Sequence, residues 1–406
     1  MTHRFARLRR FRFNLPQRIA AGLLLLFLAQ GLWITGHQTL SDQDYQYARC
    51  GREMWEKPSP LAGYFTSCGN IRDGVFAYRV AGLPLTLNLL VERGLDIFRK
   101  PEDRVVQSLG TSAAPISTWE LRHQLTHILL LLRLPFLFAG CVLGAGLWWV
   151  TRRLYGNWGG YTALALYCFS PPILKACVTP APDMFAALGV YGAIYTCIGV
   201  AHAMQGPRRK WRPRILLLTA ALGMAAASHI AALPIAALLG LVLMLWVAEG
   251  RRSHVLPAVL VAVAGALILV FVCYGFSPDA FSYVFRSAAG FVWISLEPAK
   301  RFFSTFGDAG VSLAAAAALI LYLGIRRSRY FGNTAPIVCA LVLLLLVTTG
   351  SLGTPWLWAV PFLLTFIGGV FADAFESSRG RLFIAAAACI VLLQVVVCLM
   401  TLPSLI

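Results

Sequence analysis

Two aspartates separated by one residue follow the first apolar segment of the chain. The segment covers residues 19–36, and Asp42 and Asp44 come directly after Ser41. A carboxylate at the end of a membrane helix can deprotonate a hydroxyl group or bind a divalent metal ion. The same pattern also fits a helix N-terminus, where Ser41 or Asp42 caps the first turn and negative charge is favourable. Both roles stay open, since one carboxylate can cap while the other reacts.

A third aspartate, Asp183, stands at the start of another apolar segment. It follows Pro180-Ala181-Pro182 and precedes the apolar run at 184–204. N-capping is again the alternative to a functional role. The pairing of this acid with the acids after the first segment favours a shared site, in which Asp183 supports Asp44 or Asp42. Asp44 and Asp183 are also the two candidate ligands for a divalent metal ion.

Four basic residues are candidates for binding a phosphate group: Lys175, His229, Arg133 and Arg301. Charges inside or at the ends of apolar segments are costly, so they are usually functional or paired. For Arg133 the alternative is snorkelling to the membrane surface, or a structural ion pair with Asp183 or with an acid of the polar segment 37–126. Arg301 belongs to a second loop that we expect to face outward, 276–306, which is a candidate lid over a cavity at the outer surface.

The composition predicts an all-α polytopic membrane protein, because 58% of the 406 residues are hydrophobic and only 13% are charged. Soluble domains carry about 25% charged residues. Several apolar runs reach the roughly 20 residues that cross a bilayer, and lipid leaves helices as the only structure for them. We predict about eleven transmembrane helices: 19–36, 127–150, 158–174, 184–204, 214–229, 232–249, 256–275, 307–325, 334–351, 356–372 and 383–402.

The positive charge follows the loops on one side of the membrane. Twenty of the 35 basic residues lie in the N-terminal arm and in alternate loops, together with three acids, whereas the segment 37–126 holds ten basic and ten acidic residues. This alternation follows the positive-inside rule. It predicts a cytoplasmic N-terminus and an outward-facing segment 37–126, and it argues against nucleic acid as a partner despite the net charge of +18.

We predict one membrane-embedded domain over residues 1–406, with a cytoplasmic arm at 1–18, an outward loop at 37–126 and a transmembrane bundle at 127–402. In the outward loop we expect one interfacial helix from Tyr45 to Trp55. A second is expected from Val75 to Phe98, interrupted by Gly82 and Pro84. Cys50 and Cys68 both lie in this loop, where an oxidising compartment would permit a disulfide bond. The chain has no Asn-x-Ser/Thr sequon, which favours a bacterial envelope.

Several short motifs resemble those of one enzyme family. Arg52-Glu53-Met54 follows the acidic pair, and Asp44 takes the place of the second acid in this register. The other matching segments are Arg133-Leu134-Pro135, Arg152-Arg153-Leu154-Tyr155-Gly156, Ser170-Pro171-Pro172-Ile173-Leu174-Lys175, Pro182-Asp183-Met184 and, more degenerate, Thr354-Pro355-Trp356. Together they resemble the glycosyltransferases of the C-type fold that use polyprenyl-phosphate sugars, which include the bacterial relatives of protein O-mannosyltransferases and of the aminoarabinose transferase. Gln43, which separates the two acids, departs from the adjacent pair of the family.

The resemblance implies a membrane glycosyltransferase that moves a sugar from a polyprenyl-phosphate donor to an unknown acceptor at the periplasmic face of a bacterial inner membrane. Asp44, or Asp42, would be the base, with Asp183 in support. Membrane lipid and the polyprenyl-phosphate sugar are the implied partners. Whether a divalent metal ion serves as a cofactor stays open. Two alternatives remain: a transporter or flippase for a lipid-linked or envelope substrate, and an inactive scaffold with the same fold.

Overall fold

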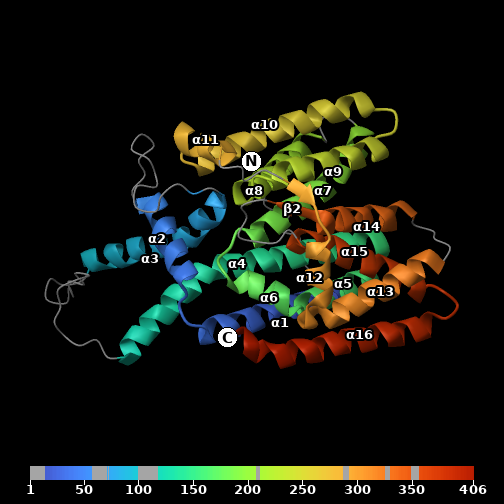
Figure 1. The fold of residues 1–406 in the computed structure, drawn as a ribbon, viewed down its shortest axis with the longest axis horizontal. Helices are drawn as coiled ribbons and strands as arrows, with labels where there is room; N and C mark the ends of the chain where they lie inside the picture. Colours follow the sequence, from blue (N-terminus) through green and yellow to red (C-terminus); the bar gives the residue numbers. More distant parts are fainter. Residues whose placement is uncertain are drawn as a thin grey trace, which may run out of the picture.

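The computed structural model describes residues 14–56, 71, 73–98, 118–206, 211–286, 292–324, 330–348 and 356–406. Most of these residues form helices that lie side by side in one bundle (Figure 1). The first half comprises α1 (Leu15–His37), α2 (Asp42–Glu56), α3 (Val75–Phe98), α4 (Thr118–Tyr155), α5 (Asn157–Cys168), α6 (Pro171–Val178), α7 (Asp183–Met204) and α8 (Arg212–Ser228). The second half comprises α9 (Ala232–Val247), α10 (Val255–Cys273), α11 (Pro278–Arg286), α12 (Glu297–Ser304), α13 (Ala309–Gly324), α14 (Tyr330–Leu345), α15 (Trp356–Phe375) and α16 (Gly380–Thr401). Short 3₁₀ turns are η3 (Arg252–His254), η4 (Phe306–Asp308) and η5 (Leu402–Leu405).

The polytopic helical fold is confirmed, but the number of eleven spans is not. In the part of the chain that the structure describes, seven helices are long and apolar enough to cross a membrane, or eight if α5 and α6 count as one bent span. The segments predicted at 214–229, 232–249 and 334–351 form helices of 17, 16 and 16 residues. At about 1.5 Å per residue, such helices reach about 25 Å, less than the roughly 30 Å of the hydrocarbon core.

The segment predicted as a straight span at 158–174 is broken. Helices α5 and α6 meet at an angle of 63°. Pro171 and Pro172 have no backbone N–H and cannot continue the hydrogen-bond ladder of α5. Gln394 of α16 donates from Nε2 to the backbone O of Phe169 at 2.9 Å. The amide thereby satisfies a carbonyl that the break would leave without a partner in the apolar interior.

Helices α2 and α3 lie together at one end of the bundle, at the left in Figure 1. They cross where two glycines meet, because a Cβ on Gly51 would lie 2.7 Å from the backbone N of Gly82. The rings of Tyr47 and Tyr78 stack with centroids 4.0 Å apart. The predicted interruption of the second helix at Gly82 and Pro84 is wrong, since α3 runs through both residues. Gly82 serves the close crossing instead of ending the helix.

The predicted span at 334–351 also ends differently. Helix α14 stops at Leu345, and β1 (Val292–Ile294) pairs antiparallel with β2 (Leu346–Thr348). The β-branched residues of this segment favour an extended conformation. The strand pair joins the loop 276–306 to the end of α14, which holds the neighbouring helix α12 near the bundle.

Helix α15 is the centre of the bundle. It packs against α5, α7, α13 and α14, and 17 of its 20 residues are buried. Helices α1, α10 and α16 instead expose many large apolar side chains, as expected for surfaces that contact lipid.

Candidate active site

A buried ion pair organises the junction between α1 and α2. Arg133 of α4 donates from Nε to Asp44 Oδ1 at 2.9 Å and from Nη2 to Asp44 Oδ2 at 2.5 Å. Asp44 is 0% exposed and Arg133 is 4% exposed. A two-point contact between guanidinium and carboxylate fixes direction as well as distance. The predicted pairing of Arg133 with an acid of the outward loop is therefore confirmed.

Asp44 also completes the N-terminus of α2. Ser41 donates from its backbone N and its Oγ to Asp44 Oδ2 at 2.9 and 2.6 Å. In return, Asp44 N donates to Ser41 Oγ at 3.2 Å. This reciprocal pattern is a capping box, so the capping alternative is confirmed for Ser41. Both oxygens of Asp44 are occupied, whereas Asp42 in the same helical turn is exposed.

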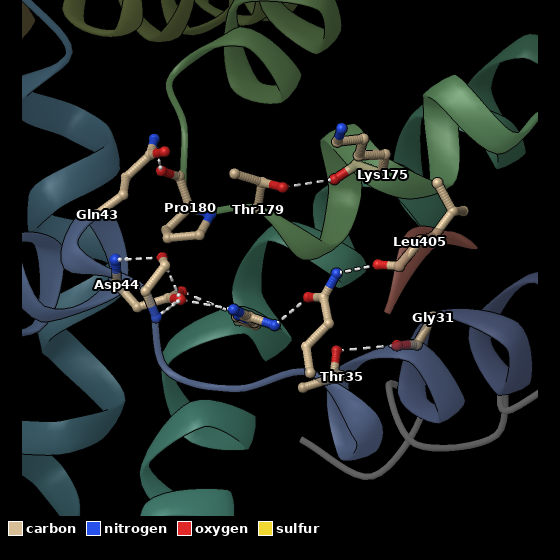
Figure 2. A network of polar contacts seen from close by, with 11 residues as sticks. Gly31, Thr35, Gln43, Asp44, Lys175, Thr179, Pro180 and Leu405 are labelled. Carbon is tan, nitrogen blue, oxygen red and sulfur yellow. Dashed lines mark hydrogen bonds and ion pairs between the residues drawn. The ribbon is translucent and has the colours of Figure 1, made fainter. Parts of the chain in front are cut away.

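Gln38 connects this ion pair to the C-terminal segment. Arg133 Nη1 donates to Gln38 Oε1, and Gln38 Nε2 donates to the backbone O of Leu405 (Figure 2). Leu405 is one of the residues that line the cavity described below. A chain of hydrogen bonds thus runs from the acid after α1 to the wall of that cavity.

Asp183 is the first residue of α7, and Pro182 is the N-cap. The N-cap alternative for Asp183 is therefore wrong, although its charge still lies in the first turn, where the helix dipole favours an acid. Asp183 Oδ1 is buried and has no hydrogen-bond partner among the described residues. Gln43 Nε2 donates to the backbone O of Pro180 at 2.9 Å (Figure 2). The residue that separates the two aspartates of α2 thus holds the segment that leads to Asp183.

His229 is buried between α8 and α9 and pairs with Asp73. Its Nδ1 lies 2.8 Å from Asp73 Oδ2, while Asp73 Oδ1 accepts from the backbone N of Ile230 at 3.1 Å. Burial alone would lower the pKa of His229, but the contact with Asp73 and the charges of Asp73 and Asp183 raise the pKa above its ordinary value. The raised pKa favours an imidazolium that pairs with a carboxylate, and no contact among the described residues supports the predicted role of His229 in binding phosphate.

One cavity of about 530 Å³ contains two of the predicted phosphate ligands. Lys175 comes from α6 and Arg301 from α12, and both are exposed at its wall. Neither forms an ion pair with a carboxylate of the described residues. The other side chains are hydroxyl-bearing or apolar, apart from one acid: Ser304, Thr305, Thr401, Ser404, Pro171, Pro172, Phe302, Trp356, Leu405 and Asp308. Cationic groups beside hydroxyls and apolar surface suit an anion that carries a hydrocarbon chain.

The acid in this cavity is Asp308, which sequence reasoning missed. Ser170 Oγ donates to Asp308 Oδ1 at 2.5 Å. Gln394 Nε2 donates to the backbone O of Gly307 at 2.8 Å, and its Oε1 accepts from Gly310 N at 2.8 Å. The turn η4 is thus fixed on both sides of Asp308. A single glutamine inside the apolar run 383–402 was the signal that could have revealed this contact.

The described residues bear differently on the predicted metal site and on the predicted disulfide bond. Among the described residues, no group of three or more His, Cys, Asp or Glu side chains could hold a metal ion. Asp44 is moreover saturated by Arg133 and Ser41, so we derive no step through a metal. Cys50 is disulfide-bonded, and Cys68, its predicted partner, lies outside the described residues.

Six of the seven predicted site residues thus fall into three groups, and the seventh, Asp42, is exposed in the first turn of α2. Asp44 and Arg133 form the junction. Asp183 and His229 interact electrostatically beside Asp73, another residue that sequence reasoning missed because Asp73-Gly74 has the pattern of a turn. Lys175 and Arg301 share the cavity. Gln38 connects the first group to the wall of the cavity that contains the third, and Gln43 connects α2 to the segment that precedes Asp183.

Comparisons with known proteins agree with this architecture. Residues 124–275 match the model of the dolichyl-phosphate-mannose-protein mannosyltransferase family. The matched part runs from α4 to the end of α10 and includes Arg133, Lys175, Asp183 and His229. No curated protein matches the chain significantly.

The chain superposes on the crystal structure of ArnT from Cupriavidus metallidurans bound to undecaprenyl phosphate, with a TM-score of 0.56. The match covers 95% of this chain and 72% of ArnT at 15% identity. The chain has the C-type glycosyltransferase fold. The oligosaccharyltransferase of Archaeoglobus fulgidus, solved in complex with Zn and sulfate, is also similar, with a TM-score of 0.50, 12% identity and coverage of 94% of this chain and 52% of that one. The C-type fold is a multi-pass membrane architecture, and at these identities the likeness establishes the fold alone.

Proposed function

We propose that the protein is a membrane glycosyltransferase that moves a sugar from a polyprenyl-phosphate donor to an acceptor at the periplasmic face of a bacterial inner membrane. One observation carries the proposal: Lys175 and Arg301, far apart in sequence, line the same cavity of a C-type fold. Ammonium and guanidinium groups bind phosphate through charge-assisted hydrogen bonds. The similar structure of ArnT binds a ligand of this class, undecaprenyl phosphate.

The orientation follows from charge. The arm before α1 and alternate loops are basic, and by the positive-inside rule this charge supports a cytoplasmic position for them. Helix α2, the end of α6 and the loop that contains α12 then face the opposite side. The cavity and the Asp44 junction thus belong to the periplasmic face in this proposal.

The reaction breaks the bond between the anomeric carbon and the phosphate oxygen and forms a bond to an acceptor oxygen. The acceptor proton passes to a carboxylate, and polyprenyl phosphate leaves with the electrons of the broken bond. Lys175 and Arg301 bind the phosphate throughout. A single displacement of this kind inverts the configuration at the anomeric carbon.

The two aspartates of α2 divide the remaining roles. Asp42 is exposed, so its carboxylate is accessible to an acceptor, and in this proposal it is the base. Asp44 positions α2 through Arg133, and it can act as the base only if one of its hydrogen bonds is released. Asp183, with its buried oxygen, supports the site from α7. The saturation of Asp44 is also the observation that favours the alternative of an inactive scaffold.

The proposal is tested by sugar transfer in membrane vesicles supplied with labelled polyprenyl-phosphate sugars. We expect Asp42→Asn to lower turnover by about 100-fold or more, the usual effect of removing a general base. Asp279→Asn is the matched control, because Asp279 is exposed on α11 and lies outside the cavity lining. If Asp42→Asn and Asp44→Asn both leave turnover within a few-fold of wild type, the mechanism is wrong.

A further inference from the structure

We propose that Asp308 makes the cavity prefer a singly charged phosphodiester to a doubly charged phosphomonoester, and so promotes release of the lipid product. The inference rests on the proposed function and assigns a specificity role to a residue of the same cavity. The donor of the proposed reaction is a phosphodiester, and the lipid that leaves is a phosphomonoester. The two ligands differ at the cavity by one negative charge.

Asp308 is the acid in the described lining of the cavity, which also contains two cations. It is 1% exposed and shares the wall with Lys175 and Arg301. It forms no ion pair with either of them among the described contacts. Its charge is therefore not cancelled by direct contact, and it acts on whatever anion the cavity contains.

The position of this carboxylate is fixed by three elements. Ser170 Oγ, between α5 and α6, donates to Asp308 Oδ1 at 2.5 Å. Asp308 N donates to the backbone O of Thr305 at 3.1 Å, and Gln394 of α16 holds the residues on either side. Burial disfavours the charged form of this carboxyl, whereas the donor hydroxyl and the N-terminus of α13, which begins at the next residue, favour the ionised carboxylate. A fixed anion at the wall cannot swing away when a ligand enters.

Charge arithmetic gives the direction of the preference. Lys175, Arg301 and ionised Asp308 together carry one net positive charge, which matches a phosphodiester. A phosphomonoester carries nearly two negative charges well above its second pKa of about 6. Because Coulomb energy is proportional to the charge of the ligand, Asp308 opposes the monoester about twice as strongly as the diester. The residue thus limits how tightly the product binds to the two cations.

The test compares two defined probes in equilibrium binding to the purified full-length protein at pH 8: undecaprenyl phosphate and its methyl ester. The methyl ester is a phosphodiester and represents the donor without its sugar. In Asp308→Asn we expect the affinity for the monoester to rise roughly tenfold more than the affinity for the diester. Asparagine keeps an acceptor for Ser170. If Asp308→Asn does not fold, Asp308→Ser makes the same change in charge and the same ratio is expected.

Glu297→Gln is the matched control. Glu297 begins α12, the helix that carries Arg301, but it is exposed and lies outside the cavity lining. The variant removes one negative charge nearby, and the ratio of the two affinities should stay within twofold of wild type. Equal changes for both probes in Asp308→Asn, or weaker monoester binding, would overturn the inference while the proposed function stands. Failure of the wild-type protein to bind either probe would instead overturn the proposed function, and the inference with it.

Discussion

The junction at Asp44 and the cavity at Lys175 hold opposite arrangements of charge, although Gln38 connects them. At the junction, Asp44 and Arg133 neutralise each other inside the protein. In the cavity, Lys175 and Arg301 are exposed beside hydroxyl groups, and neither is paired with a described carboxylate. Charged residues therefore have two different roles in this protein. The buried pair fixes the geometry of α2 on α4, and the exposed cations are available to a ligand.

The largest effect on stability is expected from a variant that breaks the Asp44–Arg133 junction. Arg133→Gln leaves Asp44 buried without its partner, which typically costs about 3–5 kcal/mol of folding free energy. Unfolding of the protein in detergent measures this loss. The double variant Arg133→Gln/Asp44→Asn should recover part of it, because the uncompensated charge is then removed.

Arg52→Gln is the control for this experiment. Arg52 pairs with Glu56 at 2.7 Å, but it is partly exposed on the surface of α2, and such pairs contribute at most about 1 kcal/mol. If Arg133→Gln unfolds with the same midpoint as Arg52→Gln, the junction is not the rigid element that the comparison requires.

A smaller effect is expected at Asp73, where the buried pair contains a group that titrates. Because the pKa of His229 is raised in the folded protein, the stability of the pair is fully present below the ordinary pKa of about 6.5 and is lost as the pH rises through the raised pKa. Asp73→Asn should therefore lower stability on the acidic side, by about 1–3 kcal/mol, because the buried imidazolium loses the carboxylate that it contacts. It should also flatten the pH dependence of unfolding above pH 6.5.

His202→Gln is the matched control for the pH profile, because His202 is exposed at the end of α7. Its profile should follow that of wild type. An unchanged profile in Asp73→Asn would show that this pair does not couple protonation to folding. The Asp44–Arg133 pair would then be the only buried pair of the site that stabilises the described part of the fold.

Much of the fold could be predicted from the sequence, because each long apolar run needs a helix in lipid. The predictions that were wrong concern helix breaks and bends, which depend on tertiary contacts. Gly82 and Pro84 have the pattern of a helix break, but Gly82 instead permits the contact with Gly51. The bend after α5 depends on Gln394, which is more than 200 residues away in sequence.

Prediction of the candidate site from the sequence is limited in the same way. Costly charges near apolar segments marked Arg133, Lys175 and Arg301, but their partners depend on packing that a single sequence does not specify. His229 carries the same signal as Lys175, yet it is buried against Asp73. Asp308 follows a glycine at the start of an apolar run and resembles an ordinary helix start, so only the cavity reveals its position.

The central claim is that the exposed cations of the cavity bind a lipid phosphate. Its most direct test is the affinity of the purified protein for undecaprenyl phosphate in Lys175→Ala, Arg301→Ala and Lys300→Ala. Lys300 is the neighbour of Arg301 on α12, but it contacts Glu297 at 3.7 Å and does not line the cavity. We predict that the first two variants lose about tenfold or more in affinity with unchanged unfolding midpoints, and that Lys300→Ala binds like wild type. Equal affinities in all three variants would contradict the account.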